Sequence, residues 1–166
     1  MTSPSLPHVA YIGLGANLGA RQVQLQSALM RLGATEGVHV AAVSPFHETD
    51  PVGGPPGQPS YLNAAARLAT SLPPEELLRV LLAVEHSLGR TRQRGVRNAP
   101  RTIDLDLLLY EDCVLDLPGL TLPHPRLHQR LFVLEPLAQV APSLVHPVLQ
   151  KTILELRDEL RGQSAC

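Results

Sequence analysis

The sequence predicts an α+β domain with a ferredoxin-like βαββαβ core, a mostly antiparallel sheet with helices packed on it, and a C-terminal helical extension. Two observations predict this class. Segments with the period of strands and helices follow one another in that order, and 44% of the residues are hydrophobic, which suits a globular protein. The length of 166 residues allows one sizeable core, so we expect residues 1–166 to form a single domain.

Hydrophobic periodicity predicts the first strand over residues 9–14 and the first helix over residues 20–32, with Gly33 as its stop. Between them, the glycines of residues 13–19 are spaced G-x-G-x-x-x-G, one residue longer than the dinucleotide-binding fingerprint. No Walker pattern is present in the sequence. We interpret this stretch as a tight strand-to-helix turn.

Two further strands are predicted over residues 38–46 and 61–70, on either side of a proline- and glycine-rich segment. Residues 48–60 could be a flexible linker, but their position between two strands of one small domain favours a shaped functional loop. Tyr61 and Asn63 share one face of the following strand. Such a pair can stack on a flat heterocycle and hydrogen-bond its edge, or simply pack.

The second helix is predicted to begin after Ser71 as N-cap, with Pro73 and Pro74 at its entry, and to end at Gly89. A strand over residues 101–110 then completes the core. The apolar positions of this helix share one face: Leu77, Leu78, Leu81, Val84 and Leu88.

The strand over residues 101–110 carries the most informative pattern of the chain. Asp104 and Asp106 lie on one face, about 7 Å apart along the strand, where like charges repel unless a cation or solvent separates them. The alternative is a solvated strand edge beside a basic loop. The opposite face is expected to be apolar, with Ile103, Leu105, Leu107 and Leu109.

An arginine cluster immediately before this strand favours a phosphate site. Carboxylates can hold Mg²⁺ while guanidinium groups hold the oxygens of a polyphosphate. Lys151 is the only lysine, so nearly all positive charge outside histidine is arginine, whose planar fork suits phosphate. The cluster comprises Arg90, Arg92, Arg94, Arg97 and Arg101.

The C-terminal part is less periodic. Residues 122–126 are expected to form a loop, and residues 127–140 a helix interrupted by Pro136. Thr152 and Glu155 have the spacing of a capping box and should open a last helix to about residue 161.

Two histidines in this part, His124 and His128, lie four residues apart. No carboxylate pattern accompanies them, so a zinc pair is disfavoured. We place His124 near phosphate, with an ordinary surface histidine as the alternative.

The net charge and the cysteine content argue against several kinds of partner and site. The net charge of −1 gives no overall basic field for bulk binding of nucleic acid. Cys113 and Cys166 fit neither a zinc site nor a disulfide framework, and there is no signal-peptide or membrane-span pattern. We therefore expect a cytoplasmic protein that binds neither nucleic acid nor membrane. We also expect a monomer, but the sequence leaves the oligomeric state open.

Several motifs follow one another along nearly the whole chain. The most specific is residues 99–107, Ala-Pro-Arg-Thr-Ile-Asp-Leu-Asp-Leu, and the others are residues 11–19, 48–53, 58–65, Glu85 with 88–92, 122–126 and 130–133. Together they resemble the 6-hydroxymethyl-7,8-dihydropterin pyrophosphokinase family of folate biosynthesis. The resemblance implies an ATP- and Mg²⁺-dependent diphosphotransferase that moves pyrophosphate from ATP to the pterin hydroxymethyl group and releases AMP.

The resemblance also implies roles for individual residues. Asp104 and Asp106 would bind two Mg²⁺ ions and, with Arg90 and Arg92, form the catalytic set. The ATP ligands would be Arg92, Arg97, Arg101, Leu107, Thr121, His124 and Arg130. The pterin ligands would be Thr49, Pro51, Val52, Tyr61, Asn63 and Phe132, with Tyr61 and Phe132 stacking on the ring.

Three rival functions remain to be weighed against this one. An RNA-binding module fits poorly, because two carboxylates occupy the exposed strand face and no aromatic RNA-binding pattern is present. A regulatory domain would bind ATP and Mg²⁺ without releasing AMP. A different pyrophosphokinase or nucleotidyl transferase would share the metal ligands but lack the Tyr61, Asn63 and Phe132 set.

Overall fold

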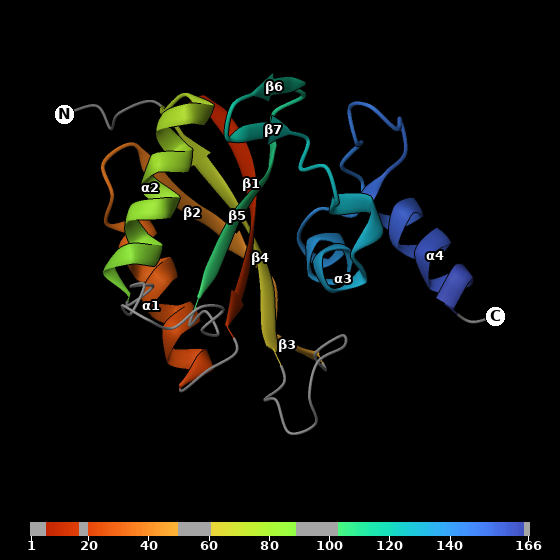
Figure 1. Ribbon diagram of the computed structural model, residues 1–166, viewed down its shortest axis with the longest axis horizontal. Helices are drawn as coiled ribbons and strands as arrows, with labels where there is room; N and C mark the ends of the chain where they lie inside the picture. Colours follow the sequence, from red (N-terminus) through yellow and green to blue (C-terminus); the bar gives the residue numbers. More distant parts are fainter. Residues whose placement is uncertain (1–5, 17–19, 50–60, 89–102, 165–166) are drawn as a thin grey trace.

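The computed structural model describes residues 6–16, 20–49, 61–88 and 103–164. Its main sheet has five antiparallel strands in the order β2-β4-β1-β5, with β3 paired to β4 (Figure 1). This order confirms the predicted ferredoxin-like arrangement, with β3 as an addition to it. The strands are β1 (His8–Ala16), β2 (Val38–Val43), β3 (His47–Thr49), β4 (Tyr61–Thr70) and β5 (Asp104–Tyr110).

Helices cover both faces of this sheet (Figure 1). The helices α1 (Arg21–Gly33) and α2 (Pro74–Ser87) lie on one face, and α3 (Leu131–Val140) and α4 (Ile153–Ser164) lie on the other. An apolar cluster lies between the sheet and each helix pair, and the side chains of β1 alternate between the two. Ile12 packs in the α1/α2 cluster and Tyr11 in the α3/α4 cluster. The expected helix over residues 20–32 is confirmed to within a residue at each end.

A β-bulge in β5 corrects the prediction for Leu109. Tyr11 of β1 lies opposite Leu109, but the next residue, Ile12, lies opposite Leu107, so Leu108 is the extra residue. Leu108 and Leu109 consequently both pack in the α3/α4 cluster, while Leu107 packs in the α1/α2 cluster. The expectation that Leu109 shares a face with Leu107 is wrong, because a bulge interrupts the alternation.

Two other boundaries differ from those predicted. The strand expected over residues 38–46 ends at Val43 as β2, before Pro45, which has no N–H to give to a ladder, and β3 begins beyond the expected range at His47. Ser71 is not the N-cap of α2: that position is Pro73, without a side-chain cap, and Pro74 is the first helical residue. Proline suits this position because its φ is already helical and the N–H that it lacks would have no intrahelical partner there. Gly89 lies outside the described residues.

A two-stranded sheet that the sequence did not predict follows β5. It consists of β6 (Leu115–Leu117) and β7 (Leu120–Leu122), which pair antiparallel across Pro118 and Gly119. Gly119 has a φ of +81°, a conformation that favours glycine. Strand β7, which carries Thr121, contacts β5, the edge strand of the main sheet.

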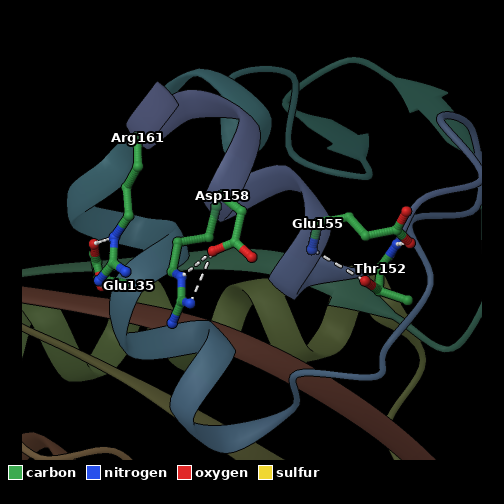
Figure 2. Close-up of polar contacts among 6 residues, drawn as sticks. Glu135, Thr152, Glu155, Asp158 and Arg161 are labelled. Carbon is green, nitrogen blue, oxygen red and sulfur yellow. Dashed lines mark hydrogen bonds and ion pairs between the residues drawn. The ribbon is translucent and has the colours of Figure 1, made fainter. Parts of the chain in front are cut away.

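Polar contacts within the C-terminal extension are shown in Figure 2. The predicted capping box is confirmed, because Thr152 N donates to Glu155 Oε1 at 3.0 Å and Glu155 N donates to Thr152 Oγ1 at 3.1 Å. Arg161 of α4 donates two hydrogen bonds of 2.6 Å to Glu135 of α3. This bidentate pair joins the two helices.

The segment over residues 127–140 is helical, but its interruption lies elsewhere than expected. A short 3₁₀ helix, Leu127–Gln129, ends before Arg130, and α3 then continues through Pro136. The proline removes one hydrogen bond inside α3. Burial of its apolar neighbours against the sheet, Leu134 and Leu137 among them, offsets that loss. In the part of the chain described, no helix is long and apolar enough to cross a membrane.

Candidate active site

A cavity of about 360 Å³ opens beside β5, which is the edge strand of the sheet. Its lining comes from three places: the side of α2 that carries Leu78, Leu82 and Glu85, the strand β5, and the segment from Gly119 to Pro125. The edge strand contributes consecutive residues of both of its faces to this lining, from Asp104 to Leu107. The cavity brings together five of the predicted site residues: Asp104, Asp106, Leu107, Thr121 and His124.

The two carboxylates of β5 are fixed by strand register. Asp104 lies opposite Gly15 and Asp106 opposite Gly13 of β1, so both side chains leave the same face of β5, and both are half-buried. Carboxylates spaced in this way can share a divalent cation with phosphate oxygens. Magnesium typically uses one or two carboxylates together with substrate phosphates.

The donor set fits Mg²⁺ held jointly with a substrate better than a metal held by protein alone. Within the described ranges, no group of three or more His, Cys, Asp or Glu side chains could hold a metal ion. A closed structural zinc site needs four such ligands. Asp104 and Asp106 would therefore need phosphate or water to complete a coordination shell.

A buried glutamate supports the strand between the two aspartates. Glu85 of α2 is only 2% exposed, and its Oε2 accepts a hydrogen bond of 2.6 Å from Leu105 N. The apolar periodicity of this helix assigned no role to Glu85, although the position of Glu85 in the sequence contained a signal for one. Glu85 lies four residues after Leu81 on the buried stripe, where a charged side chain requires partners.

His124 is held over β5 by its own backbone. Its N–H donates to Leu108 O at 2.9 Å, and its Nδ1 accepts from Arg126 N at 3.2 Å. Burial lowers the pKa of His124; Asp106 opposes this shift, and Arg130 and Arg126 add to it. The imidazole is thus neutral near pH 7 with its proton on Nε2, which is free of the Arg126 contact and suits donation to a phosphate oxygen.

The lowered pKa of His124 makes a prediction for stability. The unfolded chain takes up a proton near the ordinary pKa of 6.5, before the folded chain does. The contribution of His124 to the free energy of unfolding is therefore full above that pH and decreases as the pH falls below it. We expect His124→Gln to reduce this acid-side loss, measured by urea unfolding from pH 7.5 to roughly 5. The control is His39→Gln, in an exposed position of β2, and an unchanged pH profile in His124→Gln would contradict the prediction.

The residues predicted to bind the pterin converge from β3 and β4. Thr49 pairs with Tyr61 across these strands, and Asn63 Nδ2 donates to Thr49 Oγ1 at 2.6 Å. Asn63 is 6% exposed, so its carboxamide is held in one place. No hydrogen bond to its Oδ1 comes from the part of the chain that the structure describes, and Tyr61, two residues away on the same face of β4, is half-buried.

Phe132 and Arg130 lie at the start of α3, on the same side of the sheet as Asn63. The helix packs against β4 through the cluster that includes Ala65, which shares a face with Asn63. Phe132 is 39% exposed, and the Arg130 guanidinium carbon lies 5.7 Å from its ring centroid. This cation–π contact links a predicted ATP ligand to a predicted pterin ligand.

The remaining predicted site residues lie outside the described residues, and their roles stay predictions. Most of them belong to the arginine cluster and the others to the segment after Thr49. They are Arg90, Arg92, Arg97, Arg101, Pro51 and Val52.

Comparisons with known proteins agree on one family. Residues 11–142 match the family model described as 7,8-dihydro-6-hydroxymethylpterin-pyrophosphokinase. The chain is 41% identical over 157 residues to the 2-amino-4-hydroxy-6-hydroxymethyldihydropteridine pyrophosphokinase of Synechocystis, covering 95% of this chain and 78% of that protein. Against the enzyme of the same name from Bacillus subtilis it is 46% identical over 137 residues, covering 82% of this chain and 80% of the relative.

Larger proteins contain a similar region. The chain is 41% identical over 155 residues to the folic acid synthesis protein fol1 of Schizosaccharomyces pombe, covering 93% of this chain and 21% of that protein. It therefore spans about a fifth of that relative. A crystal structure of Plasmodium falciparum HPPK-DHPS superposes with a TM-score of 0.73 at 15% identity, over 94% of this chain and 46% of that one. That likeness shows a shared fold.

Proposed function

The chain belongs to the 7,8-dihydro-6-hydroxymethylpterin-pyrophosphokinase family, and from this premise we propose that the cavity beside β5 is its active site. The reaction transfers pyrophosphate from ATP to the hydroxymethyl group of 6-hydroxymethyl-7,8-dihydropterin, releases AMP, and belongs to folate biosynthesis. The observation that carries the proposal is the row of residues across three strands. Asn63 of β4 and Asp104 of β5 flank Gly15 of β1 on one face of the sheet.

This row suits a reaction between a flat ring and a polyphosphate. Asn63 Oδ1 can accept from N–H groups of the heterocycle while Thr49 holds the other end of the carboxamide. Asp104 and Asp106 would bind Mg²⁺, which when bound would neutralise charge on the triphosphate. His124 would donate from Nε2 to a phosphate oxygen. Leu107 and Thr121 would line the adenosine part of the cavity.

Positioning is the main contribution expected of these residues. Pyrophosphoryl transfer needs the hydroxymethyl oxygen in line with the β-phosphorus and the bond to the departing AMP oxygen, and holding two reactants in that geometry lowers the entropic part of the barrier. We propose two Mg²⁺ ions for this site. We also propose, from the sequence, that the protein is a monomer and lies in the cytoplasm.

The experiment that tests the function is AMP formation from ATP and Mg²⁺, with and without 6-hydroxymethyl-7,8-dihydropterin. We expect AMP and the pyrophosphorylated pterin in equal amounts, and no AMP without the pterin or with EDTA. ATP binding without AMP under any condition would contradict the proposal and favour a regulatory nucleotide-binding domain. Tight binding of RNA without ATP turnover would favour the RNA-binding alternative.

A further inference from the structure

The glycines of the first motif have no part in the chemistry proposed so far. One of them, Gly15, lies opposite Asn63 on one side and opposite Asp104 on the other. We propose that Gly15 is a positioning residue for the pterin, because its missing side chain keeps the Asn63 carboxamide in place and leaves the backbone between Asn63 and Asp104 uncovered. This inference rests on the proposed function and assigns a new role within the same site.

The close approach at Gly15 involves a polar atom. A Cβ added there would lie 3.1 Å from Asn63 Oδ1, tighter than ordinary van der Waals contact. Asn63 could move away only by disturbing its 2.6 Å hydrogen bond to Thr49, and it is 6% exposed, so there is little space to move into. A methyl group at position 15 would therefore displace or cover the one acceptor that Asn63 offers to a ligand.

The spacing of the row also matches the substrate. Adjacent strands lie roughly 5 Å apart, so Asn63 and Asp104 are about 10 Å apart across Gly15. That span is comparable to a fused two-ring heterocycle with a one-carbon arm. With the ring edge at Asn63, the hydroxymethyl arm would reach toward the carboxylates that hold the metal and the triphosphate. A side chain at position 15 would stand in the middle of this span.

Gly13 provides a matched control on the same face of β1. It lies two residues before Gly15, opposite Ala65 and Asp106. A Cβ at Gly13 would meet Leu108 Cδ1 at 3.5 Å, which is ordinary contact with an apolar side chain. Gly13→Ala thus adds the same methyl group to the same strand without a close contact to a hydrogen-bonding atom.

The test compares Gly15→Ala with Gly13→Ala by equilibrium binding of 6-hydroxymethyl-7,8-dihydropterin and, separately, of ATP with Mg²⁺. We expect Gly15→Ala to weaken pterin binding about tenfold, the loss of roughly one good hydrogen bond, and to leave ATP binding within about twofold. The Tm should fall by no more than about 4 °C, the cost of roughly one weakened hydrogen bond in a chain of this size. Gly13→Ala should leave both ligands within about twofold.

A double-mutant cycle shows whether Gly15 acts through Asn63. In an Asn63→Ala background, Gly15→Ala should weaken pterin binding much less than it does alone. A Gly15→Ala chain that loses its fold, or that weakens ATP and pterin binding equally, would overturn the inference, since Gly15 would then be a structural requirement. Normal pterin binding by Gly15→Ala would overturn it too. An unmodified chain that neither binds pterin nor forms AMP would instead contradict the proposed function.

Discussion

Asp106→Ala is expected to lower kcat by about three orders of magnitude, the largest single effect we predict. Asp106 lines the cavity together with His124 and lies two residues from Asp104 on the same face of β5. Without its carboxylate, one cation ligand is lost and the triphosphate charge is left less neutralised as the bond to AMP breaks. The measurement is AMP formation over a range of Mg²⁺ concentrations, because weaker cation binding should also shift the Mg²⁺ dependence upward.

The matched control for this substitution is Asp112→Ala. Asp112 is an exposed aspartate in the turn just after β5 and does not line the cavity. The control removes the same charge from the same part of the chain and should keep kcat within about twofold. If Asp106→Ala retained near-normal turnover with an unchanged Mg²⁺ dependence, the metal assignment would be wrong.

Glu85→Ala is expected to lower the free energy of unfolding by about 2–3 kcal/mol. The substitution removes the carboxylate that accepts the hydrogen bond of Leu105 N, and this N–H is buried. The same change should lower kcat by about tenfold or more, since Leu105 lies between the two aspartates and small displacements of such groups are costly. Urea unfolding measures the first effect and AMP formation the second.

Two further variants separate the causes. Glu85→Gln keeps an acceptor oxygen for Leu105 N, so we expect it to be less destabilised than Glu85→Ala. Glu76→Ala removes an exposed glutamate from the same helix and should change stability by less than about 0.5 kcal/mol. A Glu85→Ala chain as stable as the Glu76→Ala chain would show that the bond to Leu105 contributes little.

Local patterns were sufficient for much of the fold and for part of the site. Residue alternation placed Asp104 and Asp106 on one face, because side-chain direction along a strand depends only on the backbone of that strand. The Thr152–Glu155 capping box could likewise be predicted, since both of its hydrogen bonds join residues three positions apart. The motif of residues 99–107 identified the family from a short continuous segment.

What the sequence alone determined is therefore local: which segments are strands or helices, which residues share a face, and which family the chain resembles. Features that depend on contact between distant segments could be seen only in the folded chain. The bulge at Leu108 arises from pairing between β1 and β5, and the role of Glu85 from contact between α2 and β5. The place of Gly15 between Asn63 and Asp104 follows from strand register, which pairs residues many positions apart and is fixed only when the two cores pack against the sheet.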